Sequence, residues 1–296
     1  MRRMIGAALA MMMLLACGCG SSAAVDEGSI ASSDTSTPAP PATQPQTQPP
    51  ATSGGGGPQI HYQIWLQRGA MLWPVTRSGP QTLAVGRAAM QALLAGPNRL
   101  ERRHGVGTVI PAGSALLGLT LSRGTATVDL SSAYQSGGGT LSMTVRLAQV
   151  VYTLTQFSTV KRVDFALDGR PVTVFSNEGI VLDKPQTRSD YESVLPVIAV
   201  ASPGFGQTLS SPVTVSGLAN VFEANVSVEL LDAGGALLTK GVTTATCGTG
   251  CWGSYSLRLS YTVSTRQRGT LVVHDDDAAG MGSYPHELRI PVVITP

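Results

Sequence analysis

The residues that could do covalent chemistry are few, and the most reactive type is cysteine. The chain has four cysteines, of which Cys247 and Cys251 alone fall in its folded part. Cys251 could serve as the nucleophile of a transpeptidase, or the pair could form a disulfide that closes a small flexible loop. Because disulfides persist outside the cytoplasm, where the N-terminal segment described below directs the chain, the sequence favours the disulfide. No Gly-x-Ser-x-Gly elbow and no Gly-x-x-x-x-Gly-Lys-Ser/Thr loop occurs.

Acidic residues offer the next candidate chemistry. His274-Asp-Asp-Asp277 is the densest polar cluster, and its carboxylates could hold a hard cation such as Ca²⁺. Neighbouring side chains on an extended strand point to opposite faces, so we interpret it as a solvated loop and predict no metal site. A glycosidase needs two carboxylates side by side, and no spacing brings together Glu101, Asp129, Asp164 and Glu178. We therefore expect a protein that is not an enzyme and has no cofactor.

Binding is the better-supported class of function. Trp65 and Trp73 fall on the first two predicted strands, with Arg68 and Arg77 close by in sequence. Exposed tryptophan beside arginine is typical of a platform for sugars or of a protein-binding hot spot. The alternative is structural, with one tryptophan buried and the other at an interface. These four residues are the candidate binding site.

Charge argues against a nucleic-acid partner. Removing Arg2 and Arg3, which belong to the targeting segment, from the 20 basic residues leaves 18, equal to the 18 acidic ones. A nearly neutral chain lacks the basic surface that binds phosphate backbones.

The N-terminus predicts an extracytoplasmic location. A basic Met1-Arg-Arg3 precedes the apolar stretch 4–15, which is too short for a stable membrane span. Leu14-Leu-Ala-Cys17 then resembles the lipobox of bacterial lipoproteins. The resemblance implies that residues 1–16 are a signal peptide and that Cys17 carries a diacylglycerol, anchoring the protein to membrane lipid on the outer side of the cell membrane. A plain signal peptide cleaved near Ala24 is the alternative.

Residues 17–59 are expected to be a disordered tether. They are rich in Ser, Thr, Pro, Gln and Gly, a composition that cannot bury enough apolar surface to offset the cost of ordering. As a coil, such a segment reaches roughly 35 Å on average.

Residues 60–191 have the pattern of an α+β sandwich, two helices on one antiparallel sheet. The first helix is expected from Gln81, with Leu83 on its buried side, and the second begins near Thr140. An apolar stripe on the second helix recurs at steps of four and three: Met143, Leu147, Val150, Leu154 and Phe157. Its opposite, solvent-facing side is expected to carry Arg146, Gln149, Thr153 and Gln156. A strand over 160–167 and a two-residue turn at Asp168-Gly169 should follow.

Several motifs in this part resemble the GerMN domain of sporulation and spore-germination proteins. In chain order they are Leu93-Leu-Ala-Gly-Pro97, Ile110-Pro-Ala-Gly113, Ala126-Thr-Val-Asp-Leu-Ser131, Val151-Tyr-Thr-Leu-Thr-Gln-Phe157 and Val160 to Gly169. Arg188-Ser-Asp-Tyr191 is similar to the closing segment of that domain. The resemblance implies a role in the cell envelope.

Residues 197–296 are expected to form an all-β immunoglobulin-like sandwich. Seven short strand-like runs are separated by turn residues such as Asp232-Ala-Gly-Gly235. Ser211-Pro-Val-Thr-Val-Ser-Gly217 and Ala219 to Val226 resemble the immunoglobulin-like domain that often accompanies GerMN. The pair predicts a lipid-anchored envelope protein that binds an unidentified envelope protein; the alternatives are a peptidoglycan- or polysaccharide-binding module and a wall-modifying hydrolase.

Overall fold

The computed structural model describes residues 57–275 and 286–296. The predicted signal peptide 1–16, Cys17 and most of the predicted tether lie outside these residues, as do Asp276 and Asp277. No helix in the described ranges is both long and apolar enough to cross a membrane.

The first sheet is built around a long β-hairpin. Strands β1 (Gln59–Arg68) and β2 (Met71–Pro80) pair antiparallel along their whole length, from Gln59 opposite Pro80 to Arg68 opposite Met71. The short β3 (Val106–Gly107) adds to the end of β1, which gives the order β2-β1-β3. Ile64 and Leu66 alternate along β1 and are fully buried, so one face of this hairpin lies on the core.

The second sheet has the order β4-β5-β6-β7, from β4 (Leu116–Ser122), β5 (Thr125–Leu130), β6 (Arg162–Leu167) and β7 (Arg170–Pro171). The β6–β7 turn is the predicted one, with positive φ at both Asp168 (48°) and Gly169 (77°). β5 and β6 run parallel, because helix α3 (Thr140–Leu154) crosses over between them. The predicted α+β class is therefore confirmed, while the expected single antiparallel sheet is divided into two main sheets, one of them mixed, and a separate two-stranded one.

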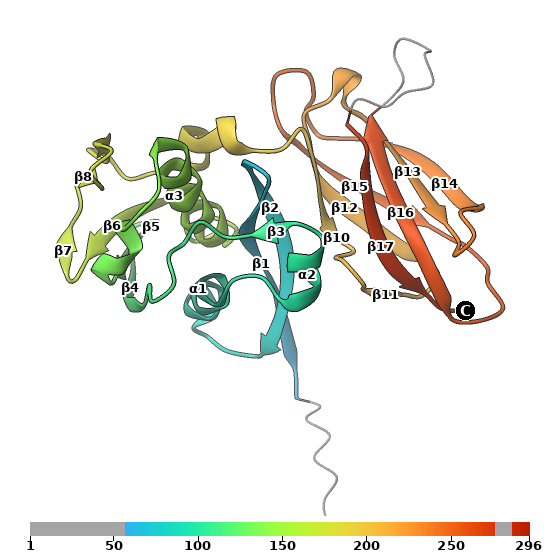
Figure 1. Cartoon of the computed structure of the whole chain (residues 1–296), viewed down its shortest axis with the longest axis horizontal. Coiled ribbons are helices and arrows are strands. Elements are labelled where there is room, and N and C mark those ends of the chain that lie inside the picture. The colour runs from blue at the N-terminus through green and yellow to red at the C-terminus, as the bar shows by residue number, and fades with distance from the viewer. Residues whose placement is uncertain (1–56, 276–285) are drawn as a thin grey trace, which may run out of the picture. The chain divides into compact units, whose positions relative to one another are not determined.

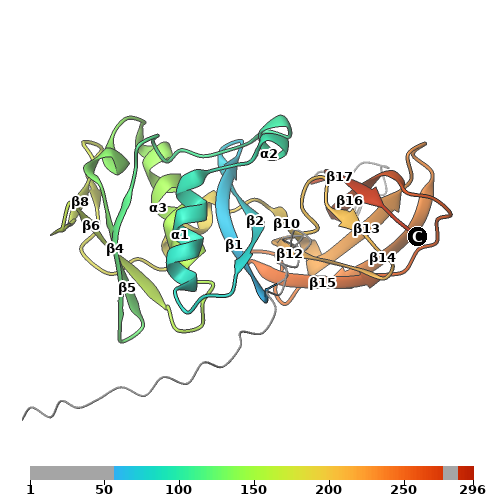
Figure 2. The ribbon, with the colours of Figure 1, turned by 90° about the horizontal axis from the view of Figure 1, so that it is seen from below.

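Helices α1 (Val85–Ala95) and α3 lie between the two sheets, as Figure 2 shows, and α2 (Arg99–Arg103) is a short third helix. Met90 and Leu93 of α1 are buried as predicted. The predicted start at Gln81 is wrong, and Leu83 is fully exposed. The hydroxyl of Thr82 accepts from the Ala84 amide at 3.0 Å, a local turn that delays the helix to Val85.

The polar side of α3 differs most from expectation, because it is buried. Thr153 is 0% exposed and its Oγ1 accepts a hydrogen bond from the Trp65 amide at 3.0 Å, while Gln149 Nε2 donates to the Trp65 carbonyl at 2.9 Å. One turn on, the Gln156 side chain bonds both the amide (2.7 Å) and the carbonyl (2.6 Å) of Gln63. Uncharged polar side chains thus form hydrogen bonds with the main-chain N–H and C=O groups along the free edge of β1, as a neighbouring strand would.

Arg146, on the same side, is also buried rather than wet. Its guanidinium donates to four main-chain carbonyls, those of Val109 (2.9 Å), Tyr134 (2.7 Å), Ser136 (3.1 Å) and Gly137 (2.9 Å). It therefore ties two loops to the helix.

The rest of this part is short elements. They are the 3₁₀ helices η1 (Ser132–Gln135) and η2 (Arg188–Val194) and the hairpin of β8 (Val174–Phe175) and β9 (Ile180–Val181).

The C-terminal part is built of β-strands, as predicted, with one single-turn 3₁₀ helix, η3 (Phe222–Ala224), in the connection between two of them. One sheet has the order β10-β12-β15, from β10 (Ile198–Ser202), β12 (Val213–Ala219) and β15 (Gly253–Leu259). The other has the order β11-β17-β16-β13-β14: β11 (Thr208–Leu209), β17 (Leu288–Ile294), β16 (Gln267–Asp275), β13 (Asn225–Leu231) and β14 (Leu237–Thr244). Figure 1 shows these strands with their labels. The seven predicted runs correspond to seven strands, and β11 is an additional one.

Candidate functional site

The tryptophans of the predicted binding site are buried, so the expected exposed platform is wrong. Trp65 is 1% exposed and its ring centroid lies 4.9 Å from that of Tyr152. Trp73 is 3% exposed and stacks on Phe205 at 6.0 Å, with the guanidinium of Arg68 at 4.8 Å from the Trp73 ring. The structural alternative describes both residues: one tryptophan is in the core, and the other is covered by the loop that follows β10.

The fourth candidate, Arg77, is held in an ion pair. Its Nη1 and Nη2 donate to the two carboxylate oxygens of Glu101 at 2.6 and 2.7 Å. Glu101 is buried and also accepts from the Asn98 amide at 2.7 Å, completing a capping box at the start of α2. The spacing Asn98-x-x-Glu101 is the sequence signal that identifies the capping role of Glu101. Because both Nη1 and Nη2 of Arg77 donate to Glu101, they are not free to bind a ligand.

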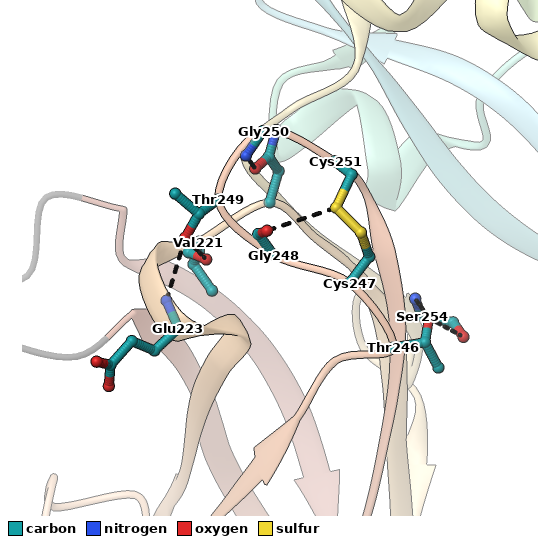
Figure 3. The surroundings of a disulfide bond; sticks show 10 residues. Val221, Glu223, Thr246, Cys247, Gly248, Thr249, Gly250, Cys251 and Ser254 are labelled. Atoms are coloured by element: carbon teal, nitrogen blue, oxygen red, sulfur yellow. Dashed lines mark hydrogen bonds between the residues drawn. A yellow bond between two sulfur atoms is a disulfide. The ribbon is translucent and has the colours of Figure 1, made fainter.

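The Cys247–Cys251 pair closes a short loop that is hydrogen-bonded to the nearby segment 220–224 (Figure 3). Cys247 and Cys251 are joined, with their Cα atoms 5.8 Å apart. Between them, the Thr249 amide donates to the Val221 carbonyl at 3.0 Å, and Thr249 Oγ1 accepts from the Glu223 amide at 3.3 Å. The disulfide loop therefore holds a second loop through one main-chain hydrogen bond and one to the Thr249 hydroxyl.

That second loop, residues 220–224 and hereafter the Phe222 loop, presents an aromatic side chain to solvent. Phe222 is 62% exposed, although it sits between the buried residues Val221 and Ala224. Glu223 and Ala224 both have positive φ, 53° and 59°, a conformation that costs free energy in residues other than glycine. A Cβ on Gly248 of the disulfide loop would lie 2.6 Å from Ala224 Cα, so only glycine permits this contact.

An exposed phenylalanine on a strained, braced loop is the strongest candidate binding feature. Aromatic side chains are enriched in protein interfaces, and a rigid loop loses little conformational entropy on association. The predicted site omitted Phe222. Its signal in the sequence is weak: one aromatic residue in the short connection between two strand-like runs.

Catalytic groups do not gather in the described ranges. No three metal-ligating side chains cluster within residues 57–275 and 286–296. At the edge of the predicted acidic loop, Asp275 Oδ2 pairs with His286 Nδ1 at 2.7 Å. Three of the four acidic residues considered for glycosidase chemistry, all but Asp164, have separate partners: Glu101 binds Arg77, Asp129 accepts from the Gly169 amide, and Glu178 accepts from the Thr140 hydroxyl.

Comparison with known protein families identifies both parts of the chain. Residues 67–173 match the family described as sporulation and spore germination. Residues 197–282 match the immunoglobulin-like domain of bacterial spore germination. The chain is a spore-germination GerMN protein. The predicted order, a GerMN domain followed by its immunoglobulin-like companion, is thereby confirmed.

Two of the solved structures that are similar to this chain belong to one sporulation protein. The first GerMN domain of GerM from Bacillus subtilis is 20% identical, with 44% of this chain and 99% of that chain covered and a TM-score of 0.36. The tandem GerMN domains of the same protein are 16% identical, with 68% and 61% covered and a TM-score of 0.39. No curated protein matches this chain in sequence. The assignment of this GerMN protein therefore rests on the two family models.

Proposed function

We propose that this GerMN protein is a non-catalytic, lipid-anchored cell-envelope protein that binds a component of an envelope protein complex. The observation that carries the proposal is the Phe222 loop, where an exposed aromatic side chain is held in place by the disulfide loop. The lipobox-like Leu14-Leu-Ala-Cys17 supports the anchor.

The geometry of the loop favours a protein partner. Phe222 offers an apolar anchor of the kind that fills a partner pocket, and the neighbouring Glu223 is exposed, with no ion pair among the described residues. A partner that accepts both side chains would carry an apolar pocket beside a basic group. Because hydrogen bonds to the disulfide loop already fix the Phe222 loop, binding does not require it to be ordered first.

The observation that favoured a glycan partner no longer supports one. Sugar platforms need an exposed aromatic face, and Trp65 and Trp73 are both buried. The peptidoglycan or polysaccharide alternative is left without a site of its own in the described part of the chain.

Photocrosslinking in native membranes tests the proposal. The full-length, lipidated protein is prepared with benzoylphenylalanine in place of Phe222 and, as a matched control, in place of Leu237, which is 49% exposed on β14. We expect a discrete protein adduct from position 222 that position 237 does not give. Recovery of only lipids and abundant porins or transporters, or the same adducts from both positions, contradicts the proposal.

A further inference from the structure

A cavity of about 260 Å³ lies beside the predicted tryptophan site, between the β1–β2 hairpin and strands β12 and β15. Its polar lining comes from Gln63, Trp65, Arg188, Ser216, Ser254 and Tyr255. We propose that this cavity binds a small carboxylate-bearing molecule, whose oxygens accept hydrogen bonds from the Arg188 guanidinium and the Trp65 indole.

The positive charge of Arg188 has no carboxylate partner among the described residues. Its Nε donates to Thr155 Oγ1 at 2.8 Å and its Nη2 to the Tyr152 carbonyl at 3.1 Å, but Nη1 has no hydrogen-bond acceptor among the described residues. The guanidinium lies 4.7 Å from the Tyr152 ring and forms no ion pair with any carboxylate in the described ranges. Burial lowers the pKa of Arg188, partly opposed by Tyr152. Arg188 is partly buried. A partly desolvated charge without a counter-charge attracts an anion, and a bound carboxylate would supply the missing counter-charge.

Trp65 supplies a second, independent observation. Its Nε1 is buried and has no hydrogen-bond partner within the described chain. Buried hydrogen-bond donors are nearly always paired with protein or with a bound molecule. The unpaired indole N–H of Trp65, a residue that lines the cavity, therefore indicates that the cavity holds a hydrogen-bond acceptor. Trp65 and Arg188 belong to the same lining, with the guanidinium 5.9 Å from the Trp65 ring.

The rest of the lining selects the type of anion. Arg188 is the only charged residue among those lining the cavity, which favours a monoanion over a phosphate dianion. Pro74 and Leu218 provide apolar walls, suited to a short hydrocarbon body. The Tyr255 hydroxyl is already used, since it donates to the Ala199 carbonyl at 3.0 Å. A planar carboxylate matches the fork geometry of a guanidinium.

The test is an NMR titration of the full chain at constant ionic strength. The indole N–H resonances are monitored while acetate, propionate or inorganic phosphate is added. Trp65→Phe assigns the Trp65 signal, and the Trp73 and Trp252 indoles serve as internal controls. We expect a saturable shift of the Trp65 N–H with the two carboxylates, at a Kd in roughly the millimolar range for ligands of so few atoms.

Two variants make the outcome decisive. Arg188→Gln is expected to weaken the carboxylate response by roughly tenfold or more. If that variant fails to fold, Ser216→Leu, which adds apolar volume to the lining and keeps Arg188, should abolish the response while the Trp73 and Trp252 signals stay in place. A Trp65 N–H that does not shift, a shift that persists in folded variants, or tighter binding of phosphate than of acetate overturns the proposal.

Discussion

Replacing Thr153 by valine tests the reassignment of the polar side of α3. The change keeps the size and branching of the side chain and removes one hydroxyl. Thr153 Oγ1 accepts the hydrogen bond of the Trp65 amide at 3.0 Å, and both residues are almost completely buried. The variant therefore leaves a buried N–H without an acceptor.

The expected magnitude follows from two opposing terms. An unsatisfied buried donor costs about 1–3 kcal/mol. The extra methyl group returns up to about 0.8 kcal/mol of apolar burial. The free energy of unfolding should therefore fall by about 1–2 kcal/mol, which lowers the urea midpoint by roughly 0.5–1 M for an ordinary denaturant dependence.

Thr144→Val is the matched control on the same helix. Thr144 is only partly buried, and its hydroxyl donates to the carbonyl of Thr140 at 2.9 Å within the helix. Its loss should change the free energy of unfolding by less than about 0.5 kcal/mol, as for most surface substitutions. Urea unfolding of both variants is monitored by tryptophan fluorescence. Equal urea midpoints would refute the conclusion that side chains of α3 form hydrogen bonds with the main-chain groups at the edge of β1.

Three further outcomes follow from the contacts of the folded part. Glu101→Gln leaves Arg77 without its carboxylate partner and weakens the α2 cap, so thermal unfolding should show a loss of about 2–3 kcal/mol, and an unchanged Tm would contradict the structural role of the pair. Replacing Cys247 and Cys251 together by serine should lower stability by about 2 kcal/mol, the value for so short a loop, and added reductant should then change only the wild type. Burial alone would raise the pKa of Asp190, but hydrogen bonds from Lys184 and Thr187 lower this pKa on balance. Its contribution to stability is thus present above the ordinary pKa of aspartate and is lost on acidification, and Asp190→Asn should flatten that part of the curve of Tm against pH.

Local patterns in the sequence predict much of the fold. The turn at Asp168-Gly169 and the buried stripe from Met143 to Leu154 depend on residues close together in the chain, and both are found as predicted. The strand-like runs of the C-terminal domain likewise correspond to strands, because alternation and turn residues are local signals.

The errors occur where a distant segment decides the outcome. Gln149 and Thr153 are polar, and periodicity alone assigns them to solvent; the acceptors and donors that bury them are main-chain groups of β1, more than 80 residues away. Their lack of charge is the one local hint, since lysine or glutamate would be expected on a wet face. Trp73 is covered in the same way by Phe205, which no pattern around Trp73 indicates.

The Phe222 loop could not be predicted because its shape depends on a second loop. Thr249 holds the Phe222 loop by accepting a hydrogen bond from the Glu223 amide and donating one to the Val221 carbonyl. The disulfide that positions Thr249 joins two other residues. From the sequence, Phe222 is one more apolar residue between two strands.

The central claim, that this protein acts by binding a partner through the Phe222 loop, is tested most directly by one affinity comparison. The protein recovered by crosslinking at position 222 is titrated against the purified full chain, its Phe222→Ala variant and a Leu237→Ala control. We predict that Phe222→Ala raises the Kd by roughly 30-fold, as for an interface hot spot, while the control leaves it unchanged. Equal affinities for all three proteins would contradict the claim.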